Sequence, residues 1–207
     1  MKNKKVIACI SCSSIVLAAT AWLVFKNLAL WLIVSDPVPQ SLDALFTFGG
    51  EDTRVTYSKS LFLKNPHALW VISSDNKKII QTLGKNGLDT TRILLVDTCS
   101  STSSEISFLN NWISGFIKKR EGTAGDKKFS QDPALPEIAL VSNWYHMRRI
   151  QLIASRRIPK KLCMVSYCSV PLSNNELAIL RNKWWNTKAV SWIVYSEWRK
   201  ILYYQFT

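Results

Sequence analysis

Short apolar runs of strand length alternate with longer amphipathic stretches along most of the chain. The runs that predict strands cover residues 44–48, 69–72, 93–96, 138–141 and 162–165. Helical spacing of apolar residues predicts helices over residues 53–63, 77–85, 104–118, 145–155, 174–183 and 197–204. The strands are apolar throughout, which is typical of a parallel sheet with helices on both faces. We therefore expect an α/β, Rossmann-like fold with a mostly parallel five-stranded sheet.

The N-terminal 35 residues follow a different pattern. Three lysines precede an uncharged stretch from Val6 to Phe25, and a second apolar run covers residues 28–34. About twenty apolar residues are enough to cross a bilayer core as a helix. A cleaved signal peptide is the alternative, because Ala19-Thr20-Ala21 has the small-x-small pattern of a cleavage site. We favour an uncleaved transmembrane anchor, since the apolar stretch continues past that site.

The anchor divides the chain into two parts. Residues 1–35 form a short tip and the membrane helix, with residues 28–34 expected at or near the membrane surface, and residues 36–207 form the α/β domain. The lysines before the span predict that the N-terminus is cytoplasmic and that the domain lies on the other side of the membrane. The lipid bilayer is thus the first expected partner of the chain, through the stretch from Val6 to Phe25.

The charge of the chain is strongly positive, at +13. Without the four lysines that flank the apolar stretch, 23 basic residues remain against 14 acidic ones, which leaves a net charge of +9. Such a surface suits anionic lipid headgroups, anionic polymers or phosphorylated precursors. We expect no nucleic-acid partner, because the domain is predicted to be exported and has no aromatic-basic motif of a nucleic-acid module.

The segment after the fourth predicted strand is the most informative one. Ser142 ends the strand, and His146 and Arg149 follow in the first turns of the next helix. Positive side chains near a helix N-terminus cost stability unless an anion binds there. Arg149 is therefore a candidate anion ligand, and His146 is a candidate general acid or base because its ordinary pKa lies near neutrality. A structural hydrogen bond that orders the loop is the alternative role for His146.

The loops after the other strands carry further candidates. Gly49 and Gly50 follow the first strand and allow a ligand close to the backbone, with Arg54 placed to bind an anion; a plain tight turn is the alternative. The second strand ends near Ser73. The loop after the third strand is rich in hydroxyl groups, and its candidate ligand-binding residues are Ser101, Thr102 and Glu105. A capping box between Thr102 and Glu105 is equally consistent with that loop.

Other kinds of site have weaker support. A serine hydrolase would need Ser73 or Ser142 beside His146, but the chain has no G-x-S-x-G elbow. A metal site is not expected, because the chain has only two histidines, although nearby carboxylates could bind a divalent ion. No cofactor is identified. Cys163 and Cys168 either remain free or close a small loop as a disulfide.

These four loops, in this order, resemble the SanA/ElyC/YdcF-like family of bacterial envelope proteins over about residues 28–205. The matching residues are Gly49, Gly50 and Arg54, then Ser73, then Ser101 and Thr102, and last Ser142, His146 and Arg149. The chain departs from the family pattern at Ser74, where members have glycine, at Asp75-Asn76-Lys77, where an acidic residue usually starts the helix, and at Glu105, where asparagine is common.

The resemblance implies a Rossmann-like domain that handles an anionic or nucleotide-like ligand and acts in the biogenesis of the envelope or its peptidoglycan. A cytosolic-type branch of the family is associated with S-adenosylmethionine. It also implies a single-pass protein of the bacterial inner membrane with an extracytoplasmic domain. We expect a membrane-anchored binding protein that supports the envelope; the alternative is a transferase or hydrolase acting on a phosphorylated or lipid-linked glycan precursor.

Overall fold

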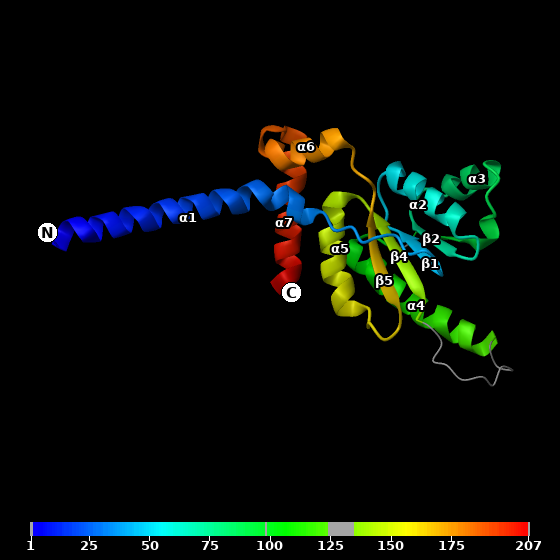
Figure 1. Ribbon diagram of the computed structural model, residues 1–207. Helices are drawn as coiled ribbons and strands as arrows, with labels where there is room; N and C mark the ends of the chain where they lie inside the picture. The colour runs from blue at the N-terminus through cyan, green and yellow to red at the C-terminus, as the bar shows by residue number, and fades with distance from the viewer. Residues whose placement is uncertain (1, 98, 124–134, 207) are drawn as a thin grey trace.

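The computed structural model describes residues 2–97, 99–123 and 135–206, with side chains described from Ser14 onward except for residues 119–123. A long N-terminal helix, α1 (Lys2–Leu32), projects from an α/β domain (Figure 1). The domain contains five strands: β1 (Ala44–Thr47), β2 (Leu69–Ser73), β3 (Ile93–Val96), β4 (Glu137–Ser142) and β5 (Met164–Ser169). All neighbouring strands are parallel and their order is β3-β2-β1-β4-β5, so the predicted α/β fold with a parallel five-stranded sheet is confirmed.

Helices cover both faces of this sheet. On one face, α4 (Thr102–Thr123) and α5 (Trp144–Arg157) share an apolar core with Phe46 and Leu140. On the other face, α2 (Asp52–Lys64) and α3 (Lys78–Lys85) pack with Leu45 and Trp70. Consecutive residues of β1 thus face opposite cores, which explains why the central strands are apolar throughout.

The strand order places the reversal point of the sheet between β1 and β4. The register pairs Phe46 with Leu140 and Thr47 with Val141, so both strands end at the same level. After β1 the chain enters α2 on one face, and after β4 it enters α5 on the other face. The two loops diverge there, and open parallel sheets bind ligands in the crevice that this divergence leaves.

Most element boundaries lie within two residues of the sequence prediction, and the larger differences concern β5, α4 and the last helix. Strand β5 begins at Met164 and continues to Ser169, beyond the predicted range 162–165, because an edge strand needs no continuous apolar run. Helix α4 runs to Thr123, beyond the predicted end at residue 118. The predicted helix over residues 197–204 is part of a longer one, α7 (Lys188–Phe206). Helix α6 (Asn174–Asn182) ends one residue before the end of its predicted range.

The end of α1 is packed against the domain. Ala29 and Leu32 are fully buried in a third apolar cluster, together with Trp184 of a short 3-10 helix, η2 (Trp184–Asn186), and Val194 of α7. Residues 28–34, predicted to lie at the membrane surface, are therefore largely covered by protein. Within α1, the segment Ser14–Leu32 is long and apolar enough to cross a membrane.

Two cysteines of the domain, Cys163 and Cys168, carry free thiols. Cys163 and Cys168 are both buried and are not joined to each other, so the disulfide considered from the sequence is not formed. Burial raises the pKa of each thiol to about 11, and both are therefore protonated and unreactive near neutral pH.

Candidate functional site

A cavity of about 980 Å³ opens at the carboxyl ends of β1, β2, β3 and β4. The structure brings all ten residues that the sequence singled out to this one cavity. They are Gly49, Gly50, Arg54, Ser73, Ser101, Thr102, Glu105, Ser142, His146 and Arg149. Parallel strands explain this convergence, because their strand-to-helix loops all lie at one edge of the sheet.

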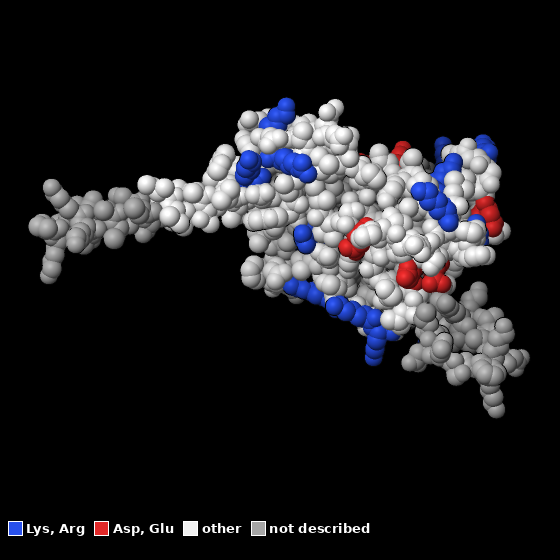
Figure 2. Space-filling view, viewed as in Figure 1, with Lys and Arg blue, Asp and Glu red and all other residues white. Residues whose placement is uncertain are grey.

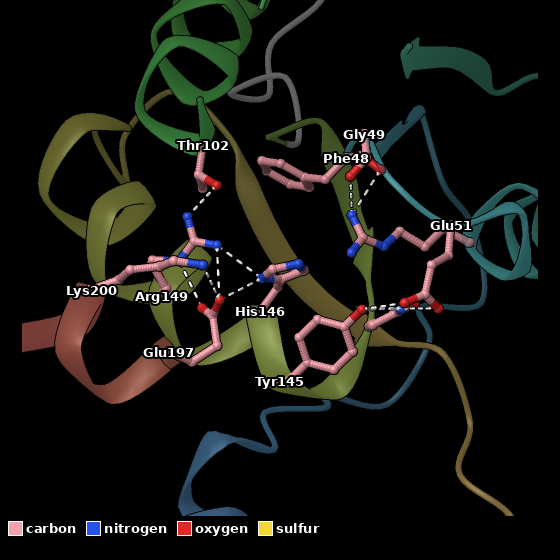
Figure 3. A network of polar contacts seen from close by, with 11 residues as sticks. Phe48, Gly49, Glu51, Thr102, Tyr145, His146, Arg149, Glu197 and Lys200 are labelled. Carbon is pink, nitrogen blue, oxygen red and sulfur yellow. Dashed lines mark hydrogen bonds and ion pairs between the residues drawn. The ribbon is translucent and has the colours of Figure 1, made fainter. Parts of the chain in front are cut away.

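One wall of the cavity is a network of charged groups centred on Glu197 of α7, a residue that is 1% exposed (Figure 3). Arg149 Nε donates a hydrogen bond to Glu197 Oε2 at 2.9 Å. The same guanidinium donates to Thr102 Oγ1 at 2.6 Å, which joins α5 to α4. Lys200 Nζ lies 2.8 Å from Glu197 Oε1. A carboxylate of the protein thus neutralises Arg149. The residue therefore has a structural role in addition to the anion-binding role that the sequence predicts.

His146 joins this network through a single ring nitrogen. Its Nδ1 atom lies 3.2 Å from Glu197 Oε1 and 2.8 Å from an Nη atom of Arg149. Arginine can only donate, so Nδ1 either carries a proton that it donates to Glu197 or lacks one and accepts from Arg149. In Figure 3 the other ring nitrogen points away from Glu197. Each tautomer therefore presents a different group on that side of the ring: a lone pair in the first case and an N–H donor in the second.

Burial controls the ionisation of both residues. Desolvation lowers the pKa of His146 below its ordinary value of 6.5, against the opposite effect of Glu197, so the imidazole is neutral at pH 7. For Glu197, burial raises the pKa, but the contacts with His146 and Arg149 outweigh burial and lower it to about 2. A neutral histidine oriented by an ionised carboxylate is an arrangement that can remove a proton from a bound hydroxyl group or water.

The opposite wall is built by Arg54 of α2, which is 2% exposed. Its Nη1 atom donates to the carbonyl oxygens of Phe48 and Gly49, and its Nε atom has no partner. Among the described residues Arg54 makes no ion pair. Its charge favours the ionised form of Glu51 and opposes the effect of burial on the pKa of Glu105. Arg54 is thus a buried cation of the cavity whose guanidinium is only partly satisfied by the described protein.

The paired glycines make room for these side chains. A Cβ atom on Gly50 would lie 2.8 Å from Arg54 Nη1, and Gly50 has a φ of +134°, which side chains rarely adopt. A Cβ atom on Gly49 would lie 3.2 Å from the Ser73 carbonyl oxygen and 3.4 Å from Glu105 Oε1. The sequence suggested that the glycines admit a ligand; in the structure they admit the protein's own Arg54 and Glu105.

Glu105 reaches across the cavity from α4 to the end of β1. Its Oε1 atom accepts a hydrogen bond from Gly49 N at 2.8 Å, and the Ser73 hydroxyl also bonds to the carboxylate. The alternative of a Thr102–Glu105 capping box is therefore wrong. Ser101 and Ser104 cap α4 instead, because Ser104 N donates to Ser101 Oγ at 3.1 Å and Ser101 N donates to Ser104 Oγ at 3.0 Å. Burial raises the pKa of Glu105 despite its hydrogen bonds.

A second polar cluster fixes the loop that precedes α5. Asn143 Nδ2 donates to Glu51 Oε2 at 2.7 Å, and the Tyr145 hydroxyl donates to the other oxygen of Glu51 (Figure 3). The hydrogen bond from Tyr145 is the main reason that the pKa of Glu51 is lowered. Next to this cluster, the hydroxyl of Ser142 is buried at the cavity wall and has no hydrogen-bond partner in the described part of the chain.

Four cavity residues come from α7 and were not foreseen from the sequence. They are Arg199, Lys200, Tyr203 and Tyr204. Glu197 was missed for the same reason, since it does not follow a strand. The sequence did contain one indication of Glu197. It is a single acidic residue on the apolar face of the last helix, between Val194 and Ile201, and an unpaired carboxylate buried there would be costly.

Charges of both signs line the cavity. Its cations lie on α2, α5 and α7, whereas Asp75 and Asp97 follow β2 and β3 on the other side. Within the described parts of the chain no group of three His, Cys, Asp or Glu side chains could hold a metal ion. The cavity can therefore bind an anionic group at one end and hydroxyl donors at the other.

Comparison with known proteins gives no assignment: no protein-family model matches the chain, and no curated protein matches it.

Proposed function

We propose that this chain is a membrane-anchored protein that binds a phosphate-bearing or nucleotide-like anionic ligand in the cavity at the carboxyl edge of the sheet. The observation that carries the proposal is Arg54, a cation that is 2% exposed, makes no ion pair among the described residues and has an unpartnered Nε atom. A buried charge without a counter-ion is costly, and an anion bound beside it would offset that cost.

The arrangement of the other charges narrows the class of ligand. Asp75 and Asp97 stand at the ends of β2 and β3, while His146 and Arg149 follow β4. Three strand spacings separate β3 from β4, which is about 14 Å. A ligand that joins a phosphate to a sugar or another polyol fits this distribution, because carboxylates accept hydrogen bonds from hydroxyl groups.

The location and process follow from the anchor and from the family resemblance. A span from Val6 to Phe25 with lysines before it would place the domain outside the cytoplasm of a bacterial cell. The resemblance to the SanA/ElyC/YdcF-like family implies that a phosphate-bearing ligand of this domain would be a precursor of the wall or the envelope. We accordingly assign the protein to the biogenesis of the envelope or of its peptidoglycan.

One observation favours an enzyme as the second candidate function. Glu197 lies 3.2 Å from His146 Nδ1, and the second ring nitrogen points away from that carboxylate. In the Nδ1–H tautomer, the unprotonated Nε2 atom would take the proton of a water or hydroxyl group. The oxygen of that group would attack the ligand phosphorus, and the bond between phosphorus and the leaving oxygen would break. This chemistry fits a hydrolase or transferase of phosphorylated or lipid-linked glycan precursors.

Thermal unfolding of the full chain in detergent tests the proposal, with inorganic phosphate, glucose 1-phosphate, uridine diphosphate and S-adenosylmethionine as probes. A ligand at one hundred times its Kd stabilises a folded protein by about 2.7 kcal/mol. We expect a phosphate-bearing probe to raise the Tm of the wild type and to lose that effect in Arg54→Lys. Lys85→Gln, which removes an exposed cation of α3, is the control and retains the effect. A response to S-adenosylmethionine alone would contradict the phosphate assignment.

A further inference from the structure

The outer face of α7 carries large apolar side chains that nothing in the described protein covers. Trp192, Tyr195, Leu202 and Phe206 are 72%, 50%, 54% and 85% exposed. At 100° per residue these four positions fall within a sector of about 80° on the helix. We call this row the outer stripe of α7. Large exposed apolar side chains gathered on one face of a surface helix indicate an interaction site.

The attachment of α1 fixes what lies beside this stripe. Trp184 Nε1 donates to the carbonyl oxygen of Lys26 at 3.1 Å, and Trp198 Nε1 donates to that of Leu28 at 2.9 Å. Arg148 Nε donates to the carbonyl oxygen of Trp31 at 2.8 Å. These bonds, with the burial of Ala29 and Leu32, hold the last turns of α1 in one orientation. Helix α7 runs across the end of α1, on the side of the domain from which α1 projects (Figure 1).

The level of the membrane along α1 follows from the same contacts. Residues from Phe25 onward pack against the domain, so the part of α1 that is free to enter a bilayer ends near residue 25; counted from the predicted start at Val6, it is about 30 Å long. Trp22 contacts Trp185 of η2 with ring centroids 5.5 Å apart. Tryptophan is enriched at the boundary between lipid and water, so these rings mark the membrane surface.

Basic side chains lie at the same level. Arg181, Lys183 and Lys188 are exposed around η2, and Lys26 is half-buried in α1. Figure 2 shows basic side chains over the α6 end of the domain, where α1 joins it. Cations beside exposed tryptophans suit an anionic membrane surface better than the apolar interface of a soluble protein partner.

We propose that α7 lies in the membrane–water interface with its outer stripe against the lipid, and that the ligand of the cavity is the phosphate headgroup of a membrane lipid. This inference rests on the proposed function, to which it adds the source of the ligand. Because α7 crosses the end of α1, a bilayer spanned by α1 runs along α7 and meets the outer stripe.

Helix α7 also connects the membrane to the cavity. Its buried face contains Val194, Glu197 and Ile201, and its cavity face contains Lys200 and Tyr204. Arg199 lies within the sector of the outer stripe, and Tyr203 lies between that stripe and the cavity face; both line the cavity while remaining exposed. A headgroup at the bilayer surface would reach Arg199 first and Arg54 beyond it, without its acyl chains leaving the membrane.

Photo-crosslinking of the full chain in phosphatidylcholine nanodiscs, with and without phosphatidic acid, tests the position of α7. p-Benzoylphenylalanine replaces Trp192 or Phe206, and the control carries it in place of the exposed Lys85 of α3. We expect lipid adducts from positions 192 and 206 and none from position 85. Adducts to a second copy of the chain, or no lipid adducts, would overturn the proposal. Circular dichroism of each variant confirms that its fold is intact.

Binding measurements separate a lipid from a soluble source of phosphate. Native mass spectrometry of protein released from the nanodiscs measures retained phosphatidic acid, and titration in detergent measures binding of inorganic phosphate. We expect Arg199→Ala to retain phosphatidic acid about tenfold less strongly than wild type, with no loss in Lys85→Ala, which removes an exposed cation of α3. Equal binding of inorganic phosphate and phosphatidic acid, unaffected by Arg199→Ala, would overturn the lipid source and leave the proposed function standing. No binding of either would overturn both.

Discussion

The carboxylate of Glu197 lies 3.2 Å from Nδ1 of His146, across 51 residues of chain and between two helices, α5 and α7. The same carboxylate binds the guanidinium of Arg149 at 2.9 Å. Glu197 thus neutralises one cation and orients one imidazole at the wall of the cavity. Its buried position makes it the group on which both the stability and the chemistry of this wall depend.

Removing Arg149 should destabilise the protein far more than removing Lys200, although both contact Glu197. Arg149→Met leaves a buried carboxylate with only His146 and a half-exposed lysine beside it, and breaking a buried pair costs about 3–5 kcal/mol. Lys200→Met removes a half-exposed partner and should cost about 1 kcal/mol or less. Urea unfolding of the two variants measures the difference. Equal losses would mean that Arg149 does not compensate the buried charge.

The free energy of unfolding should fall on acidification in two ranges. His146 has a folded-state pKa below 6.5, so the unfolded chain binds protons more readily and stability is lost as the pH falls below 6.5. Glu197 has a folded-state pKa of about 2 against 4.5, so its contribution is present above pH 4.5 and is lost as the pH falls toward 2. Glu105, whose pKa is raised, acts in the opposite direction above pH 4.5.

Substitutions show which titrating group causes the loss of stability in each pH range. In a series of Tm measurements against pH, His146→Gln should flatten the decline that begins near pH 6.5, and Glu197→Gln should flatten the decline below pH 4.5. Glu105→Gln should make the decline between pH 6.5 and 4.5 steeper, because it removes a group that stabilises the folded state on protonation. An unchanged profile in His146→Gln would show that burial does not control this imidazole.

The glycines provide a test of how Arg54 is held. In Gly50→Ala the new Cβ atom would meet Arg54 Nη1 at 2.8 Å at a φ of +134°, and we expect a loss of about 1–3 kcal/mol. Gly115→Ala should instead stabilise the protein by about 0.5–1 kcal/mol, since Gly115 lies within α4 and nothing lies within 4 Å of its Cβ position. Chemical denaturation of both variants checks the contrast. A neutral Gly50→Ala would mean that the guanidinium is free to move.

The tautomer of His146 decides between the two candidate functions. If the protein binds an anion without reacting, Nδ1 accepts from Arg149 and the proton resides on Nε2, where it donates to the ligand. If the protein is an enzyme, Nδ1–H donates to Glu197 and Nε2 is free to act as a base. Nitrogen-15 chemical shifts of the labelled imidazole at pH 7 distinguish the two forms. Glu197→Gln is the control, because it weakens the preference for Nδ1–H.

The sequence predicted the sheet and its carboxyl edge well, for a physical reason. Parallel topology places every strand-to-helix loop at one edge, so the loops bearing Arg54, Ser73, Thr102 and His146 had to converge once the strands were identified. Strand β5 was displaced in the prediction because an edge strand needs no continuous apolar run, and its Ser166 and Ser169 ended the signal early.

The contribution of α7 lay beyond the reach of such reasoning. Its position depends on the packing of Val194 and Ile201 against the end of α1 and the neighbouring helices, which no local pattern encodes. Without that position, Glu197 had no visible partner and Arg199 no visible role. The sequence also suggested a capping box between Thr102 and Glu105 and did not identify Ser101 as the cap of α4. Adjacent hydroxyl residues have the same local preference, and only the contacts with Arg149 and Gly49 decide where Thr102 and Glu105 turn.

The central claim is that an anionic ligand binds to the buried guanidinium of Arg54. Calorimetric titration of the full chain with glucose 1-phosphate and with uridine diphosphate, in wild type, Arg54→Lys and Lys85→Gln, tests it most directly. We expect at least one of these ligands to bind the wild type and Lys85→Gln equally, and to bind Arg54→Lys at least tenfold more weakly, because lysine cannot reproduce the fork of a guanidinium. Binding that is the same in all three proteins, or absent from the wild type, would contradict the claim.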